Sequence, residues 1–321
     1  MRLASPEEPT MLLLNPVARR GPAEFASLRS KLALRLNLVG AAMPASAADL
    51  AREVEGALGQ GVRRFVVAGG DGTLSRVAAH LQGTGAALGV LPWGTGNTFA
   101  HGVGLPGRLP ELLDVLCRGC VHRYDVGIAE SHGERRAFLN SLTLGVSQRL
   151  ATLLTPGIKR RFGWLAWPFA IERALRTTPQ VQVRLRYDDG RNDAFATLQL
   201  IVANGRALAG PLRATPSASG QDGRLEVFSL GAASPLACLR SAAQTALGRH
   251  IHDPRAHYRA CTRVEVTSEP PVALDLDGDV WGRTPVTCRV LPAALHVLVP
   301  GAQQEQRTGV ATPVRMRERL R

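Results

Sequence analysis

The sequence predicts an α/β protein of two domains: a parallel α/β domain over residues 1–127 and an antiparallel, β-rich domain over residues 128–299. The length of 321 residues exceeds that of one average domain. Up to about residue 123, apolar runs of strand length alternate with helical patterns, which is typical of a parallel sheet. Beyond that point strand-like runs follow one another with turn signals between them, as in antiparallel sandwiches and open barrels.

The elements of the first domain are predicted from short apolar runs and from apolar residues three or four positions apart. The run 64–68, RFVVA, is a strand that leads directly into a glycine-rich turn. The helix over 47–58 has Ser46 or Asp49 near its start, where a side chain can cap the first free N–H groups. The other strands are expected at 10–15 and 87–91, and the other helices at 23–36, 74–81 and 109–117.

The second domain is predicted from strand-like runs separated by turn residues. Asp188-Asp189-Gly190 is a hairpin turn signal. Two helical inserts are expected, at about 157–176 and 234–248, and the Arg-rich tail over 300–321 is expected to return to the first domain or to be disordered. The strands are expected at 136–144, 181–187, 195–203, 224–230, 263–268, 272–276, 286–290 and 295–299.

The composition excludes several classes of protein. Hydrophobic residues make up 45% and charged residues 20%, so disordered and collagen-like chains are excluded. No run reaches 18 apolar residues, which argues against a transmembrane helix, and the first ten residues lack the apolar core of a signal peptide. Five cysteines, an odd number in a chain of this size, favour a reducing compartment over a disulfide framework. We therefore expect a cytoplasmic protein.

The net charge of +13 is the compositional outlier. Lys31 and Lys159 are the two lysines among 39 basic residues, so the surface charge is carried by arginine. A GC-rich genome would explain the preference for arginine over lysine but not the net charge. Such a surface favours anionic partners: nucleic acid, acidic lipid headgroups or phosphorylated ligands. No helix-turn-helix, zinc-finger or RNA-binding signature is present, so we expect no nucleic-acid partner.

The strongest motif is the strand–GGDGT–helix sequence at 64–81. Gly69, Gly70 and Gly72 allow a sharp turn and close approach to a ligand, and the free N–H groups of the following helix suit phosphate. Asp71 in such a loop is explained if it meets a divalent cation that the phosphates also bind. The alternative is a tight turn whose Asp caps the helix. The sequence has neither a Walker loop nor a GxGxxG dinucleotide pattern.

Two further turns follow predicted strands. One is PWGTGNT over 92–98, and the other is Asn15-Pro16. The turns after parallel strands meet at the carboxyl edge of the sheet, where open α/β sheets bind their ligands. We therefore expect the three turns to converge on one crevice.

Taken in order, these motifs resemble the diacylglycerol-kinase catalytic-domain family, which includes bacterial diacylglycerol and lipid kinases, sphingosine kinases and ceramide kinases. The match runs over about residues 10–300, and GGDGT by itself is shared with NAD kinases. It implies an NAD-kinase/diacylglycerol-kinase-like fold with the active site between the domains. The matching motifs are NP at 15–16, GGDGT at 69–73, GTGN at 94–97, YDVG at 124–127, FLN at 138–140, NG at 204–205, the stretch 216–223 and DGD at 277–279.

The resemblance implies transfer of the γ-phosphoryl group of ATP to a lipid hydroxyl, with diacylglycerol or a related neutral lipid as acceptor. Asp71 would connect to Mg²⁺ through water, with help from Asp125. Asp277 or Asp279 would be the base that accepts the hydroxyl proton. Read without the family, 274–279 is a β-turn of solvated acids. The residues implied to surround ATP are Asn15, Pro16, Gly69, Gly70, Asp71, Gly72, Thr73, Leu74, Ser75, Gly94, Thr95, Gly96 and Asn97.

The sequence departs from the family at three places. Thr98 stands where the family commonly has Asp, and Asp279 stands where it usually has Glu. The stretch 207–211 holds one glycine, Gly210, where relatives are richer in glycine near the lipid side. Thr98 and the altered DGD motif leave open a catalytically weak protein that binds nucleotide or lipid, and the shared GGDGT motif leaves open an NAD-kinase-like enzyme.

Bacterial members of the family also carry a second, structural metal in the β-rich domain. The positions that match its ligands are the Asp222 side chain and the backbone carbonyls of Ser219 and Arg224. Gln221 replaces an acid that is frequent in relatives, which lowers the charge of this metal site.

The segment 156–176 combines basic and aromatic residues. This composition is typical of an interfacial helix that touches anionic lipid, and the alternative is an ordinary helix that packs its aromatic residues on the β-rich domain. With the lipid-kinase resemblance it predicts a protein that docks on the anionic inner membrane surface, and the sequence leaves a homodimer open. The residues concerned are Lys159, Arg160, Arg161, Phe162, Trp164, Trp167, Phe169, Arg173 and Arg176.

Overall fold

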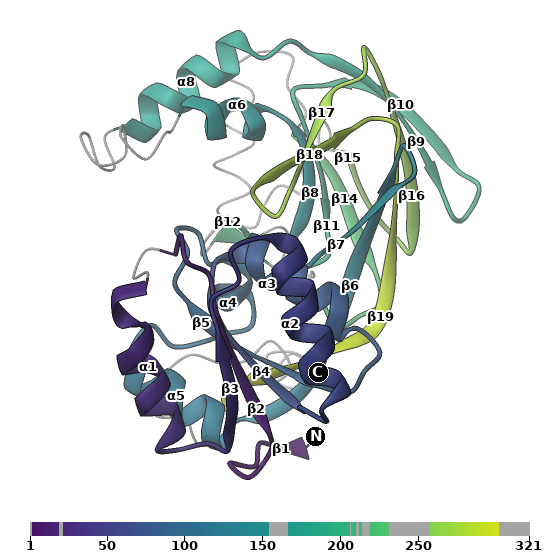
Figure 1. Cartoon of the computed structure of the whole chain (residues 1–321). Coiled ribbons are helices and arrows are strands. Elements are labelled where there is room, and N and C mark those ends of the chain that lie inside the picture. Colours follow the sequence, from purple (N-terminus) through teal and green to yellow (C-terminus); the bar gives the residue numbers. More distant parts are fainter. Residues whose placement is uncertain are drawn as a thin grey trace.

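The computed structural model describes residues 2–18, 22–153, 166–205, 207–209, 212–213, 219–230 and 257–301. These residues form two lobes, and one long strand, β19 (Val286–Val299), runs through both of them (Figure 1). The fold class is the one expected: a parallel-stranded N-terminal lobe and an antiparallel C-terminal lobe. In the described part of the chain, no helix is long and apolar enough to cross a bilayer.

The N-terminal lobe is built on a parallel sheet. Its strands follow the order β3 (Leu38–Ala42), β2 (Thr10–Leu14), β4 (Arg64–Gly69) and β5 (Ala87–Pro92), and the end of β19 then pairs parallel to β5. A two-residue strand, β1 (Arg2–Leu3), pairs with β6 (Cys120–Ser131). The helices are α1 (Phe25–Ala33) after the short turn η1 (Pro22–Glu24), α2 (Ala47–Gly59), α3 (Asp71–Leu81), α4 (Thr98–Gly102) and α5 (Leu109–Arg118).

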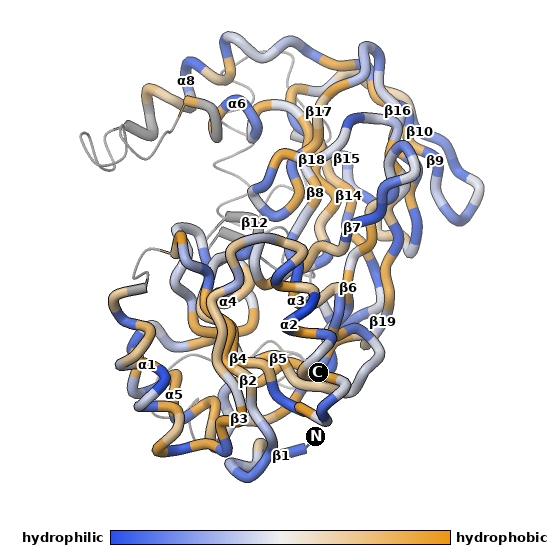
Figure 2. Tube along the Cα trace, viewed as in Figure 1, coloured by the Kyte–Doolittle hydropathy of each residue, from blue (hydrophilic) through white to orange (hydrophobic). Residues whose placement is uncertain are grey.

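This sheet is buried on both faces, which explains the continuous apolar runs of its central strands. Alternate residues of β4 serve opposite faces: Phe65 and Val67 pack in the cluster that contains α2 and α3, whereas Val66 and Ala68 pack in the one that contains α1 and α5. Figure 2 shows these strands as the most hydrophobic part of the lobe. Ser46 caps α2 by accepting a hydrogen bond from the Asp49 N–H, as the sequence predicts.

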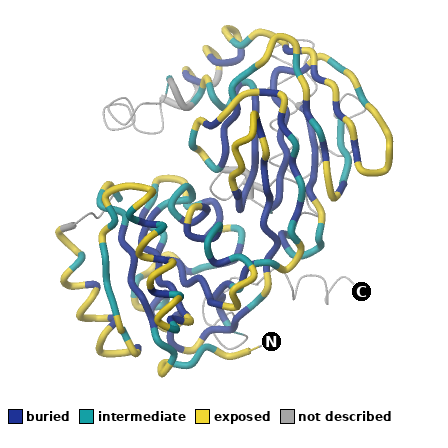
Figure 3. The backbone as a smooth tube through the Cα atoms, turned by 45° about the vertical axis from the view of Figure 1, so that its right-hand side comes forward, coloured by how far each residue is buried: buried dark blue, intermediate teal, exposed yellow. Residues whose placement is uncertain are grey.

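The C-terminal lobe packs two sheets against each other. Within the described residues, one is six-stranded in the order β15-β14-β11-β8-β17-β18, and the other continues the N-terminal sheet through β19-β16-β9-β10. The strands β9 and β16 expose alternate residues, and the buried ones fill the core between the sheets (Figure 3). Bounds are β7 (Glu134–Phe138), β8 (Ser141–Gly145), β9 (Val181–Tyr187), β10 (Asn192–Thr197), β11 (Gln199–Ala203), β14 (Leu225–Leu230), β15 (His257–Cys261), β16 (Arg263–Glu269), β17 (Ala273–Leu276) and β18 (Asp279–Arg283).

The lobes share the pair formed by β6 and β19. These two strands run antiparallel from the bottom of the N-terminal lobe into the C-terminal lobe, with an irregular register between Leu291 and Leu295. The sequence predicts two strands, 286–290 and 295–299, where the structure has this single strand with a bulge. The expected domain boundary at residue 127 falls inside β6.

Other differences from the expected elements have simple causes. The strand β6 was missed because its first half, CVHRY, lacks an apolar run, and β3 was missed because LVGAA is short and rich in small residues. The expected strands 136–144 and 195–203 are each divided, into β7 and β8 and into β10 and β11.

Smaller elements complete the described residues. The helices α6 (Val146–Leu153) and α8 (Ala166–Thr177) contact each other and extend from the C-terminal lobe (Figure 1). The two short strands β12 (Ala207–Ala209) and β13 (Leu212–Arg213) pair with each other. The first part of the expected helical insert 157–176, the whole of 234–248 and the tail from residue 302 lie outside the described residues.

Candidate active site

The structure brings the three predicted turns together at the carboxyl edge of the parallel sheet. The Asn15 side-chain amide donates to Thr73 Oγ1 at 2.7 Å, which ties the first turn to the GGDGT turn. The GGDGT turn and the turn 92–98 meet at two glycines, Gly70 and Gly94. A Cβ placed on Gly94 would lie 2.4 Å from the Gly70 Cα. Because this neighbour is backbone, glycine is required for the two turns to approach this closely.

The helix α3 begins at Asp71, and its N-cap residue, Gly70, provides no side-chain cap. The N–H groups of Thr73 and Leu74 both donate to the Gly70 carbonyl. The positive end of α3 therefore lies at the glycine turns, where it favours an anion such as phosphate. Beside it, Thr95 and Gly96 are exposed.

The turn 92–97 is closed by its own asparagine. Asn97 has a positive φ of 49°, and its side-chain oxygen accepts the Gly94 N–H at 2.8 Å while its nitrogen donates to the Gly94 carbonyl at 3.0 Å. This side chain therefore shapes the turn, and the exposed backbone of Thr95 and Gly96 is the part open to a ligand.

Asp71 connects the two glycine turns to the C-terminal lobe. Its carboxylate accepts the N–H of Thr98 at 3.0 Å, the N–H of Phe99 at 2.8 Å and the side-chain amide of Asn140 at 3.1 Å. Asp71 thus caps α4, the helix that follows the turn 92–97, and does not cap α3, the helix to which it belongs. Thr98 is buried and contributes one of these backbone N–H groups.

Asp277 is the most heavily hydrogen-bonded acid of the site. Its carboxylate accepts the Ser75 hydroxyl at 2.5 Å and the backbone N–H groups of Leu139, Asn140 and Ser141 at 2.7–2.9 Å. Burial raises the pKa of Asp277 to about 6, although the hydrogen bonds act in the opposite direction. Because Ser75 belongs to α3, this acid fastens the C-terminal lobe to the N-terminal lobe.

Asp279, two residues further on, is engaged far less. Its carboxylate forms one ion pair, with Arg76 of α3 at 2.8 Å, and both side chains are nearly half exposed (44% and 48%). A Cβ placed on Gly72 would lie 2.7 Å from Asp279 Oδ2, so the acid stands directly against the glycine-rich turn. The two candidate bases therefore differ sharply: one is enclosed by donors, and the other faces the cleft between the lobes.

A cavity of about 350 Å³ adjoins Asp279. It lies between α2 and α3 of the N-terminal lobe and β7 of the C-terminal lobe, and Gly72 and Ser75 belong to its wall. The cavity therefore opens at the point where the acidic turn meets the glycine-rich turn.

Two residues implied to surround ATP have other contacts in the structure. The Leu74 side chain is 1% exposed and belongs to the core around α3, and its N–H is bonded to Gly70. The Ser75 hydroxyl lies against Asp277 and the Asp71 carbonyl. Pro16 lies partly exposed in the first turn.

Asp125 braces the C-terminal lobe. It is 3% exposed, and its oxygens accept the N–H groups of Gly223 at 2.8 Å and Ala293 at 2.7 Å. The first bond holds the turn 219–224 and the second holds the bulge of β19. The part in a magnesium network that the resemblance implies for Asp125 stays a prediction.

The turn expected to hold a second metal is closed by internal hydrogen bonds. The Asp222 carboxylate accepts the Arg224 N–H at 3.1 Å, and the Ser219 hydroxyl accepts the Gln221 N–H at 3.2 Å. Across the described residues, no group of three or more His, Cys, Asp or Glu side chains is arranged to hold a metal ion. The structural metal site stays a prediction.

The sequence did not assign roles to several residues at this site. Asn140 was part of the FLN motif, but its contact with Asp71 depends on the packing of the two lobes. Arg76, five residues after Asp71 on the exposed side of α3, had no signal of its own.

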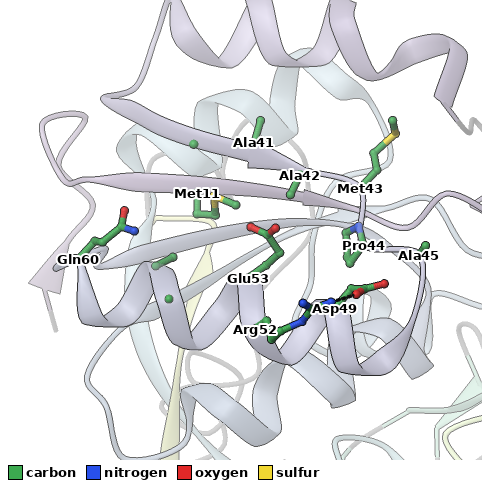
Figure 4. Close-up of a pocket in the computed structure, with 13 residues that line it drawn as sticks. Met11, Ala41, Ala42, Met43, Pro44, Ala45, Asp49, Arg52, Glu53 and Gln60 are labelled. Atoms are coloured by element: carbon green, nitrogen blue, oxygen red, sulfur yellow. Dashed lines mark hydrogen bonds and ion pairs between the residues drawn. The ribbon is translucent and has the colours of Figure 1, made fainter.

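A second, larger cavity of about 720 Å³ lies between β3 and α2 (Figure 4). Its wall includes Met43, Asp49 and Glu53, and Figure 4 shows Asp49 paired with Arg52 at its rim. None of the site residues predicted from the sequence lines it, so it stands apart from the converging turns.

Two family models match the chain and together cover most of it. Residues 9–129 match the diacylglycerol kinase catalytic domain, and residues 140–299 match the YegS C-terminal NAD kinase beta sandwich-like domain. These two ranges follow the two lobes, except that the second also contains the end of β19, which pairs with β5 in the N-terminal lobe.

Similar proteins agree with these matches. A "Probable lipid kinase YegS-like" of Pseudomonas syringae is 31% identical over 262 residues, which cover 79% of this chain and 81% of the relative. A diacylglycerol kinase of Bacillus subtilis is 28% identical over 252 residues, 75% of this chain and 79% of the relative. The solved structure of a diacylglycerol kinase from Bacillus anthracis superposes with a TM-score of 0.69 at 20% identity, covering 92% of this chain and 98% of that one.

Proposed function

Because the chain belongs to the diacylglycerol kinase and YegS-like lipid kinase family, we propose that it transfers the γ-phosphoryl group of ATP to a hydroxyl group of a lipid, diacylglycerol or a related neutral lipid. The observation that carries this proposal is the position of the Asp279 carboxylate against Gly72. A carboxylate with one ion pair stands there beside a glycine-rich turn at the positive end of α3. Phosphoryl transfer needs this combination of a base and a phosphate cradle.

The phosphates of ATP would lie over the converging turns. The glycines of the turns 69–72 and 94–96 carry no side chains that would cover the backbone, and the end of α3 supplies N–H groups and a positive field. Thr95 and Gly96 are exposed and can contact the same phosphates. The role of Asn15 would be to hold the GGDGT turn through Thr73.

The residues present fit a magnesium ion held through water. Three of the four lone-pair positions of the Asp71 carboxylate accept hydrogen bonds, and the remaining one can accept a hydrogen bond from a metal-bound water. Mg²⁺ commonly keeps several of its waters and uses one or two carboxylates together with substrate phosphates. Bound in this way, the ion would neutralise charge on the phosphates.

Asp279 would take the proton from the acceptor hydroxyl. A hydroxyl is a poor nucleophile near neutral pH, so removal of its proton by a positioned carboxylate speeds its attack on phosphorus. Arg76 keeps the carboxylate at the mouth of the cleft, and Asp277 holds the turn that carries it. Asp277 itself accepts four hydrogen bonds, which suits a positioning residue better than a base.

The proposal is tested by incubating the protein with labelled ATP and neutral lipids in mixed micelles. We expect label on a lipid hydroxyl, loss of the reaction when Mg²⁺ is chelated, and restoration when it is added back. The panel should contain diacylglycerol, ceramide and sphingosine, and NAD should be a separate arm. Label on NAD and on no lipid would reject the proposal in favour of an NAD-kinase-like enzyme.

We propose in addition that the protein works at the cytoplasmic face of an anionic membrane. In support, α8 carries an exposed apolar ring, Phe169 (77% exposed), and the exposed Arg173 and Arg176 on the same helix. Lys159, Arg160, Arg161, Phe162 and Trp164 lie outside the described residues. The membrane partner, the absence of a nucleic-acid partner and the homodimer stay predictions.

Liposome binding tests the membrane proposal. We expect binding to anionic vesicles that weakens as salt rises, because each basic residue near such a surface contributes about 1 kcal/mol. Phe169→Ala should reduce the part of binding that survives high salt. Equal binding to neutral and anionic vesicles at low salt would contradict the role given to the basic residues.

A further inference from the structure

The arginine of α3 that pairs with Asp279 stands close to the glycine-rich turn. Arg76 lies one helical turn after Gly72, so the two residues share a face of α3. Side chains of a helix lean toward its N-terminus, which brings the guanidinium of Arg76 toward the first turn of α3. Arg76 Nη2 lies 2.8 Å from Asp279 Oδ2, and the same oxygen would lie 2.7 Å from a Cβ placed on Gly72. A single carboxylate therefore separates the guanidinium from the glycine-rich turn.

The charges at this site are unbalanced. Three carboxyl groups meet there, those of Asp71, Asp277 and Asp279. In the part of the chain that the structure describes, these acids form one ion pair, and its cation is Arg76. A triphosphate bound over the turns adds further negative charge, which cations must offset. Lysine, arginine and histidine are absent from the three turns themselves, 15–16, 69–75 and 92–98.

The ion pair between Arg76 and Asp279 can be exchanged for a contact with phosphate. Both side chains are nearly half exposed, and exposed pairs are weak because water screens them and both side chains lose freedom. A phosphate offers the guanidinium two parallel hydrogen bonds and more negative charge than one carboxylate. A phosphoryl group over Gly72 would therefore compete with Asp279 for Arg76.

We propose that Arg76 binds the γ-phosphoryl group of the nucleotide and leaves Asp279 to do so, which frees this carboxylate to act as the base. The inference rests on the proposed function and adds a catalytic residue to it. In the transfer, the acceptor oxygen forms a bond to the γ-phosphorus, the bond from this phosphorus to the bridging oxygen of ADP breaks, and the hydroxyl proton passes to Asp279. Arg76 stays on the oxygens of the group being transferred, where it stabilises the charge of the transition state.

This exchange couples nucleotide binding to access to the base. In the structure Arg76 occupies Oδ2 of Asp279, the oxygen that faces Gly72. A hydroxyl that attacks a phosphoryl group over Gly72 approaches the carboxylate from this side. When the guanidinium moves to the phosphate, Oδ2 is free to accept the proton. The base is thus open on the phosphate side only when a γ-phosphoryl group is present.

Nucleotide binding in the absence of any acceptor tests the contact directly. Titration calorimetry compares ADP with the β,γ-imido analogue of ATP, both with Mg²⁺, because the analogue carries a γ-phosphoryl group that is not transferred. For Arg76→Gln we expect the affinity for the analogue to fall about tenfold or more, with the affinity for ADP nearly unchanged. In the micelle assay, kcat of this variant should fall about 10²-fold or more.

The matched control is Arg35→Gln. Arg35 follows α1, is 46% exposed and pairs with Asp114, so its loss removes the same charge and a similar ion pair from the same lobe. Both affinities and kcat should stay at the values of the unmodified protein. Arg76→Lys keeps the charge without the two parallel hydrogen bonds and should recover part of the affinity for the analogue. Melting curves by circular dichroism establish that the variants are folded.

Two results would overturn the inference while the proposed function stands. Equal losses of affinity for ADP and for the analogue in Arg76→Gln would assign the arginine to the other phosphates. Unchanged affinities with a lower kcat would mean that Arg76 only holds Asp279 in place.

The binding arm also separates the inference from the proposed function. A selective loss of affinity for the analogue, in a protein that labels no lipid of the micelle panel, would support the contact with the γ-phosphoryl group and reject the lipid acceptor. Failure of the unmodified protein to bind either nucleotide would reject both.

Discussion

The glycine turns of the N-terminal lobe and the acidic turn of the C-terminal lobe meet at one site, and their carboxylates are engaged to very different degrees. Asp71 accepts three hydrogen bonds and Asp277 accepts four, all from groups of the protein. Asp279 has one ion pair, with an exposed arginine. Carboxylates of one site can thus be divided into those that hold the structure and one that is open to a substrate.

The difference has a physical basis. A buried carboxylate costs several kcal/mol unless donors surround it, so the enclosed acids are stable because their oxygens are satisfied. The same donors occupy all four lone-pair positions of Asp277 and three of those of Asp71, so a substrate hydroxyl has little access to these oxygens, whatever the pKa of the acid. An exposed acid with one partner keeps lone pairs available, which is what a general base requires.

The variant Asp279→Asn is expected to have the largest effect among the tests of this comparison. If Asp279 is the base, kcat for lipid phosphorylation should fall about 10²–10⁴-fold, while the melting temperature stays close to that of the unmodified protein. Asp114→Asn, which removes an exposed acid of α5, is the matched control and should leave kcat unchanged. An unchanged kcat in Asp279→Asn would mean that Asp279 is not the base.

A second test uses the pKa of Asp277, which burial raises from an ordinary value near 3.8 to about 6. The folded state then holds this proton more tightly than the unfolded state, so the contribution of Asp277 to stability falls as pH rises from about 4 to about 6. The full change is on the order of 2–3 kcal/mol.

Urea unfolding of the unmodified protein and of Asp277→Asn measures this effect. The asparagine does not titrate, so the unmodified protein should lose stability relative to the variant between pH 4.5 and pH 7. A difference in unfolding free energy that is the same at both pH values would show that Asp277 does not titrate in this range.

The variant Gly94→Ala tests whether the site depends on the close approach of the two glycine turns. The added Cβ would lie 2.4 Å from Gly70 Cα, so the turns must separate and the N–H groups that Asp71 accepts must shift. We expect a loss of about 1–3 kcal/mol in unfolding free energy and a lower kcat/KM for ATP. Gly56→Ala in α2, where nothing lies within 4 Å, should instead stabilise by about 0.5–1 kcal/mol. Equal effects of the two changes would contradict the close approach of the turns.

The smallest effects distinguish two neighbours on α3. Ser75 donates to Asp277, and Arg76 pairs with Asp279. Ser75→Ala removes a donor from an enclosed acid and should cost about 1–2 kcal/mol of unfolding free energy. Arg76→Gln removes an exposed ion pair and should cost less than about 1 kcal/mol. Urea denaturation at pH 7 measures both losses. A larger loss in Arg76→Gln than in Ser75→Ala would show that Asp279, and not Asp277, holds the lobes together.

Local patterns predicted most of the N-terminal lobe, because β2, β4 and β5 are apolar on both faces and end in turn residues that the sequence displays. The convergence of the three turns followed from the geometry of parallel sheets. Long-range pairing was not predictable in this way. The single strand β19 was read as two, because its bulge at residues 291–295 resembles a turn.

For the candidate site as well, local motifs identified residues, whereas the contacts that depend on packing were not predictable. The motifs identified Asp71, Asp277 and Asp279, but acids two residues apart in one turn are equivalent in sequence, and only packing gives one four donors and the other an open face. Arg76 had no signal, because basic residues are frequent throughout this chain, and its pairing with Asp279 depends on the packing of the two lobes.

The path of β19 also has a consequence for protein synthesis. Residues 296–297, near its end, pair with β5, and residues 295–299 pair with the first half of β6. Until a ribosome has made and released these residues, the parallel sheet of the N-terminal lobe presents β5 as an unpaired edge, and such edges invite pairing with other chains. The N-terminal lobe is encoded first, yet its sheet is completed by β19, the last strand among the described residues, so both lobes are expected to reach their native state after β19 has been translated.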